Sequence, residues 1–98
     1  MLRNPNFSVY GTSYANNIYD IEVRTINPVD NDKVEVDILL STYTDATKAH
    51  KVHEKKFSLL DLTNDPATLC PALYQIKLIE QHGTEEVDGT ILNNFIVL

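Results

Sequence analysis

The sequence predicts an all-β protein, a small antiparallel β-sandwich of about six or seven strands. Three observations lead to this fold class. Apolar and polar residues alternate over several stretches, and turn residues separate these stretches at intervals of about ten residues. The chain of 98 residues also has room for only one core, so we expect a single domain over residues 1–98. The alternative is an α+β domain, in which an antiparallel sheet carries one helix at about residues 66–82.

The N-terminal residues 1–17 are polar and rich in asparagine. Phe7 and Val9 alternate with Ser8 as in a short edge strand, and Gly11 begins a turn. We expect this segment to be either a frayed terminus or a loose arm that docks on a neighbouring subunit.

The middle of the chain predicts three strands. Residues 18–26 and 33–43 alternate regularly, and residues 27–32 join them through a proline and an Asn/Asp cluster, which favour tight reversals. Residues 50–60 form the third predicted strand.

The pairing of the second and third of these strands needs an irregularity. If Leu40 pairs with Val52, a regular ladder places Val36 opposite Lys56. Placing Val36 opposite Phe57 instead requires one extra residue in the third strand, so we predict a β-bulge within residues 53–56. A helix capped by Asp45 and extending through Lys56 is the alternative for this region.

Residues 69–78 fit both a strand and a helix. As a helix they carry an apolar stripe at spacings of three and four, with Gly83 placed as a C-cap. As a strand they place three apolar side chains on one face, those of Tyr74, Ile76 and Leu78. We predict a strand in a hairpin with residues 90–98, because Asp88-Gly89 is a strong turn dipeptide and the residues after it are rich in Ile, Val and Phe.

The stretch Leu69-Cys-Pro-Ala-Leu-Tyr74, followed by Gln-Ile-Lys-Leu, resembles the loop and strand of fibronectin type III and related immunoglobulin-like domains. In that family a leucine and a proline precede a tyrosine that forms the tyrosine corner. The resemblance implies a β-sandwich and structural roles for Pro71 and Tyr74. It also implies that the Tyr74 hydroxyl hydrogen-bonds to the backbone of the preceding loop.

Charge and composition exclude several classes of function. The formal net charge of -6 and the pI of about 4.8 argue against nucleic-acid binding, which requires Lys and Arg to neutralise phosphates. Cys70 is the single cysteine, so no intrachain disulfide forms, as expected in a reducing compartment. The sequence has no secretory signal pattern and no membrane-spanning run. We expect a protein of the cytoplasm or of a virion, not secreted through a signal peptide.

Residues 48–56 hold half of the eight Lys and Arg residues and two of the three histidines. This basic stripe is a candidate docking site for an acidic partner. Its lysines are Lys48, Lys51, Lys55 and Lys56. The alternative is a solvated edge strand, whose lysines discourage edge-to-edge aggregation.

Catalytic and metal chemistry have little support in the sequence. His50 and His53 point to opposite faces of a strand, and His82 is distant, so we predict no metal site. The chain has three glycines and contains neither a nucleophile elbow nor a phosphate-binding glycine loop. We expect no enzymatic activity and no cofactor.

The chain ends on apolar residues, of which Phe95, Ile96 and Leu98 are candidate partner contacts. They belong either to a core strand or to a strand that completes the sheet of a neighbour.

These observations predict a non-enzymatic structural or interaction protein, a subunit or adaptor of a larger protein assembly. Its expected partners are copies of itself or other assembly subunits. The small size, the asparagine-rich loops and the lack of site chemistry lead us to expect a viral or phage virion component. The alternative is a small acidic regulatory binder or inhibitor that occupies a basic site on a partner protein.

Overall fold

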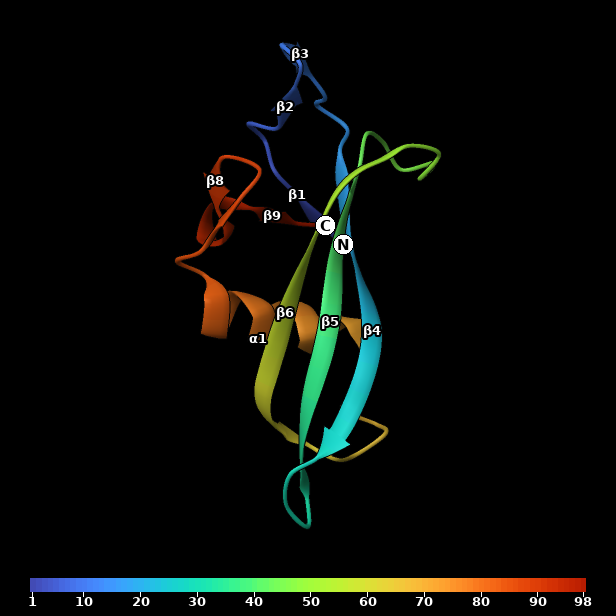
Figure 1. The fold of residues 1–98 in the computed structure, drawn as a ribbon, viewed down its shortest axis with the longest axis vertical. Coiled ribbons are helices and arrows are strands. Elements are labelled where there is room, and N and C mark those ends of the chain that lie inside the picture. Colours follow the sequence, from blue (N-terminus) through green and yellow to red (C-terminus); the bar gives the residue numbers. More distant parts are fainter.

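The computed structural model describes residues 1–98 and contains a five-stranded antiparallel sheet of order β6-β5-β4-β1-β9, two small hairpins and one α-helix (Figure 1). In chain order, the elements are β1 (Leu2–Arg3), β2 (Ser8–Val9), β3 (Thr12–Ser13), β4 (Ile18–Pro28), β5 (Lys33–Tyr43), β6 (Lys51–Thr63), α1 (Pro71–His82), β7 (Glu86–Val87), β8 (Thr90–Ile91), the 3-10 helix η1 (Leu92–Asn94) and β9 (Ile96–Val97).

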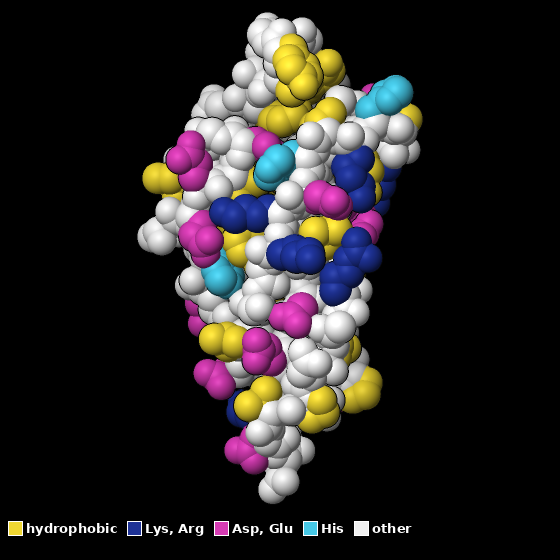
Figure 2. Space-filling view, viewed as in Figure 1, with side chains coloured by type: hydrophobic (Ala, Val, Ile, Leu, Met, Phe, Trp, Pro, Cys, Tyr) yellow, Lys and Arg dark blue, Asp and Glu magenta, His cyan; other side chains and the backbone are white.

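The predicted antiparallel, mainly β architecture is confirmed, but the alternative with one helix fits better than a pure sandwich. The five strands form one curled sheet, and α1 crosses behind its long strands in Figure 1. We call the side that carries α1 the apolar face and the opposite side the polar face. The polar face is the side seen in Figure 2.

The strand prediction for residues 69–78 is wrong, because this segment enters α1. Pro71 stands at the first helical position, where its fixed φ suits a helix and its missing N–H costs no hydrogen bond. Tyr74 and Leu78, one helical turn apart, are buried, whereas Ile76 between them is 60% exposed. The helical period therefore decides which side chains enter the core. Tyr74 lies within a helix and not in front of a strand, so it does not occupy a tyrosine corner.

The three middle strands are confirmed as β4, β5 and β6. They form the long part of the sheet, with β5 between the other two. The alternative helix between Asp45 and Lys56 is absent: a bend at residues 44–45 and a turn at residues 46–47 precede β6.

The predicted bulge between β5 and β6 is wrongly placed. The register shifts at two other points, each with one extra residue in β6: Leu60 and Asp61 together face Glu35, and Val52 has no partner on β5. Asp61 has a positive φ of 58°, which re-aims the chain so that Leu62 also reaches the core.

The core is one cluster on the apolar face, and residues from both chain ends contribute to it. The N-terminal segment is anchored through Leu2 and Phe7, which are both buried. Asn17 reinforces this anchor, since its side chain accepts a hydrogen bond from the Asn4 N–H at 2.9 Å and donates one to the Asn4 carbonyl at 2.8 Å. The cluster consists of Leu2, Tyr19, Val34, Val36, Ile38, Leu40, Phe57, Leu59, Leu62, Tyr74, Leu78, Val87, Leu92 and Phe95.

The predicted turn at Asp88-Gly89 is confirmed, but its hairpin joins β7 to β8. Both turn residues have positive φ, 49° and 80°, as a type I′ turn requires. Gly83 follows α1 with an ordinary helical φ of -59°, so it is not a left-handed cap. A Cβ at Gly83 would lie 2.2 Å from the Asn93 side chain, so the absence of a side chain allows η1 to pack closely there.

Candidate functional site

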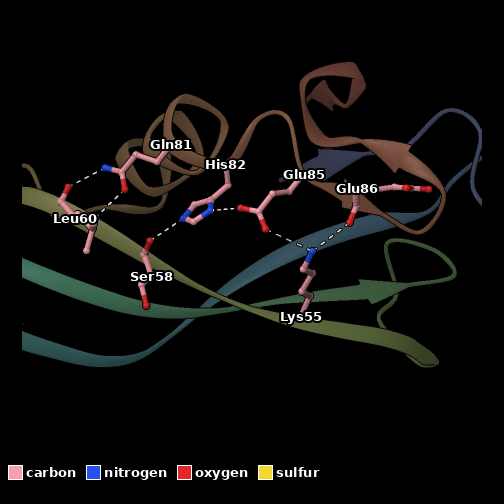
Figure 3. A network of polar contacts seen from close by, with 7 residues as sticks. All are labelled: Lys55, Ser58, Leu60, Gln81, His82, Glu85 and Glu86. Carbon is pink, nitrogen blue, oxygen red and sulfur yellow. Dashed lines mark hydrogen bonds and ion pairs between the residues drawn. The ribbon is translucent and has the colours of Figure 1, made fainter.

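The two sides of the long sheet differ in how their backbone is covered. At the β6 side, α1 occupies the outward backbone groups. The Gln81 amide donates to the Leu60 carbonyl and accepts from the Leu60 N–H, both at 2.8 Å (Figure 3). His82 Nε2 lies 2.8 Å from the Ser58 carbonyl oxygen. Since these groups are the ones that an added strand would use, this part of the β6 edge is closed.

His82 also joins α1 to the loop before β7. Its Nδ1 contacts a carboxylate oxygen of Glu85, and Lys55 Nζ lies 3.7 Å from the other oxygen of that carboxylate (Figure 3). Lys55 further donates to the Glu86 carbonyl at 3.2 Å. The pKa of Glu85 lies below its usual range, mainly because of the hydrogen bond with His82.

His82 and Glu85 form a histidine–carboxylate pair whose polar atoms also contact neighbouring elements. Both ring nitrogens of His82 lie within hydrogen-bonding distance of an oxygen atom, Nδ1 of the Glu85 carboxylate and Nε2 of the Ser58 carbonyl, so both contact neighbouring parts of the fold. The network connects α1, β6 and the β7–β8 hairpin, and its geometry assigns it a structural role.

A second polar cluster centres on Asp88. Its Oδ2 accepts hydrogen bonds from the Tyr19 hydroxyl at 2.7 Å and from Thr42 Oγ1 at 3.0 Å, and its Oδ1 lies 3.3 Å from His53 Nδ1. Burial raises the pKa of Tyr19, and the hydrogen bond to Asp88 raises it further. The cluster fastens the β7–β8 turn to β4, β5 and β6.

The opposite side of the long sheet is open. β4 pairs with β5 along its length, but on its other side only Tyr19 has a strand partner, Leu2 of β1. Figure 1 shows no strand beside the lower part of β4 on the side away from β5. Val23 and Ile26 stand opposite the buried Ile38 and Val36 and so lie on the apolar face, yet they are 41% and 46% exposed. We call residues 20–28 the open β4 edge.

The polar face carries a hollow of about 480 Å³. Asp37 lies in it and accepts hydrogen bonds from Thr25 at 2.7 Å and Ser58 at 2.8 Å, which lower its pKa. Basic and acidic side chains are interspersed on this face (Figure 2). The hollow has no single sign of charge, since its lining residues are Arg24, Thr25, Asp37, Ile38, Leu39, Glu54, Lys56, Phe57 and Ser58.

The structure spreads the four lysines of the basic stripe over different surroundings. Lys48 pairs with Asp20, Lys51 lies 3.4 Å from Glu54, and Lys55 belongs to the network around Glu85. Lys56 lines the hollow on the polar face. Acidic side chains thus accompany most of the stripe and reduce its positive potential.

The C-terminal candidates divide between core and surface. Phe95 is buried and packs edge-to-face on Tyr19, with ring centroids 4.7 Å apart. Ile96 and Leu98 are about half exposed. Leu98 borders a small apolar groove between α1 and β9, which Ala72, Gln75, Ile76, Ile79 and Val97 complete.

No group of three or more His, Cys, Asp or Glu side chains is arranged to hold a metal ion. No helix combines the length and hydropathy needed to cross a membrane. Comparison with family models, curated proteins and solved structures found no match to this chain.

Sequence reasoning missed the open β4 edge and the covered β6 edge. The alternation of residues 18–26 identifies a strand but not its neighbours. The covered β6 edge is due to Gln81 and His82 at the end of α1. Their contacts with β6 depend on the tertiary fold, so the sequence alone does not reveal them.

Proposed function

We propose that this chain is a non-enzymatic structural or interaction protein, a subunit or adaptor of a larger protein assembly. The observation that supports this proposal best is the open β4 edge, where Val23 and Ile26 expose apolar surface and the outer side of the strand has no partner after Tyr19. Such an edge binds other strands through main-chain hydrogen bonds.

The polar networks support the non-enzymatic part of this proposal. The His82–Glu85 pair and the Asp88 cluster both use their polar atoms to connect elements of the fold. We propose a viral or phage virion as the setting, on the basis of the small size and the asparagine-rich loops.

An acidic binder or inhibitor is the second candidate. The ion pairs of Lys48, Lys51 and Lys55 favour this candidate, because they neutralise much of the positive surface. The surface of a chain with net charge -6 is then mainly negative. Such a protein would stay monomeric, and its association rate with a basic partner would fall steeply as salt rises.

Light scattering after size exclusion, over a range of protein concentration and at low and high salt, tests the first proposal. We expect a defined oligomer that persists at high salt, because apolar contacts and main-chain hydrogen bonds are weakly screened. A monomer under every condition would contradict self-assembly and favour the acidic binder.

A further inference from the structure

We propose that two copies of this chain associate through the open β4 edge, with the two β4 strands antiparallel about a twofold axis at Val23. This inference rests on the proposed assembly function. It identifies the partner as a second copy of the chain and the surface as the open β4 edge. It would join the long strands of both copies into one continuous antiparallel sheet, with an α1 on the same face of each half.

The backbone of β4 is oriented for such pairing. The Ile21 N–H bonds to the side chain of Asp20 at 3.1 Å, so it points away from β5. Successive residues of a strand alternate in the direction of their backbone groups, so those of Val23 also point outward. The register with β5 shifts only after Val23, at Arg24. The Ile21 N–H is already bonded to Asp20, so the groups available to a strand from the open side are the Ile21 carbonyl and the N–H and carbonyl of Val23.

Charge complementarity identifies a second copy as the occupant. Glu22 and Arg24 flank Val23, and their side chains approach each other at 3.5 Å, with 41% and 55% of their surfaces exposed. In antiparallel pairing centred on Val23, residue 22 of each copy faces residue 24 of the other. Glu22 would thus meet Arg24 twice across the interface. An exposed pair within one strand contributes little to folding, so it can be exchanged for the intermolecular pairs.

Val23 fits the same arrangement. It is 41% exposed on the apolar face and would meet its own copy at the axis. Like residues that face each other across a twofold axis make a self-complementary contact. A second copy cannot pair with the β6 edge at residues 58–60 instead, because Gln81 and His82 occupy the outward backbone groups there.

Charge exchange tests the pairing. Glu22→Arg places two cations opposite each other at both sites, and Arg24→Glu places two anions there. We expect each single variant to raise the dimer dissociation constant at least roughly tenfold, and the double variant Glu22→Arg/Arg24→Glu to restore it. Sedimentation velocity measures this constant. Glu80→Arg is the matched control for Glu22→Arg, because it makes the same change in charge and breaks a comparable exposed pair, Lys77–Glu80 at 3.5 Å, on α1.

Cross-linking tests the position of the axis. In a Cys70→Ser background, Val23→Cys should form an intermolecular disulfide on mild oxidation, since facing residues of antiparallel strands lie about 4.5–5.5 Å apart between Cα atoms. Val29→Cys, also exposed, is the control. Its two copies would lie roughly 40 Å apart in this dimer and should not cross-link.

Wild-type association separates the two proposals. If the chain self-associates but the charge variants leave the dissociation constant unchanged, or Val29→Cys cross-links as well as Val23→Cys, the β4 pairing is overturned and the assembly function stands. If the wild-type chain is monomeric at every concentration, self-assembly and the β4 pairing both fail.

Discussion

Ser41 and Thr42 are neighbours on β5, and both side chains are buried, but their environments differ. Thr42 points to the apolar face and donates its hydroxyl hydrogen to the Asp88 carboxylate at 3.0 Å. Ser41 points to the polar face, where its Oγ has no hydrogen-bond partner. A buried hydroxyl without a partner costs free energy, whereas a hydrogen bond to a charged group contributes to stability.

Thr42→Val should lower the free energy of unfolding by about 1.5–3 kcal/mol, because it removes a hydrogen bond to a carboxylate without changing the size of the side chain. Ser41→Ala should leave the free energy unchanged or raise it by up to about 1 kcal/mol, since the lost hydroxyl has no partner. Urea denaturation measures both. Equal destabilisation by the two substitutions would contradict the assigned hydrogen bonds.

Asp37 provides a test by pH. Its native pKa lies below the usual value, chiefly because Thr25 donates a hydrogen bond to it and secondly because Ser58 does. A lowered native pKa stabilises the fold above the unfolded pKa, and this contribution disappears as the pH falls through the native pKa.

Thr25→Val should therefore raise the pKa of Asp37 toward its ordinary value, and Thr25→Ser should keep it low because the hydroxyl remains. NMR titration of the Asp37 carboxyl carbon measures the shift. An unchanged pKa in Thr25→Val would refute the role of this hydrogen bond.

Among the elements, local pattern predicts β4, β5 and β6 well, because one buried face imposes a period of two along each strand. It fails at α1, where both periods fit the same apolar residues and the packing of Tyr74 and Leu78 against the sheet decides. The register shifts between β5 and β6, at Val52 and at Leu60 with Asp61, depend on which residues of β6 reach the core. The alternation of apolar and polar residues alone does not show which residues those are.

Gln81 is the contact through which α1 closes the β6 edge, so its substitution should expose that edge. We expect Gln81→Ala to accelerate hydrogen exchange at the Leu60 amide. Gln81→Glu retains an oxygen that can accept from this amide and should preserve most of its protection. NMR-detected exchange measures both, and equal rates in the wild type and Gln81→Ala would show that Gln81 does not protect the edge.

At the scale of the molecule, the body measures 48 × 26 × 19 Å. Its long sheet is covered by α1 at residues 58–60 of the β6 edge and is open along residues 20–28 of the β4 edge. The candidate site could be predicted only in part. Composition and the lack of site chemistry predicted an assembly protein. The residues predicted to bind its partners were the lysines of the basic stripe and the apolar residues at the C-terminus. The open β4 edge depends on the shortness of β1, which covers Tyr19 and no later residue of β4. That topology follows from packing and not from any one stretch of sequence.

Residue-resolved hydrogen exchange at low and high protein concentration tests β4 as the association surface most directly. We expect the Val23 amide to exchange more slowly at high concentration, Glu22→Arg to remove this effect, and the Lys56 amide on β6 to be unaffected. If the protein associates while the Val23 amide keeps the same exchange rate, or if protection appears at β6 instead, β4 is not the association surface.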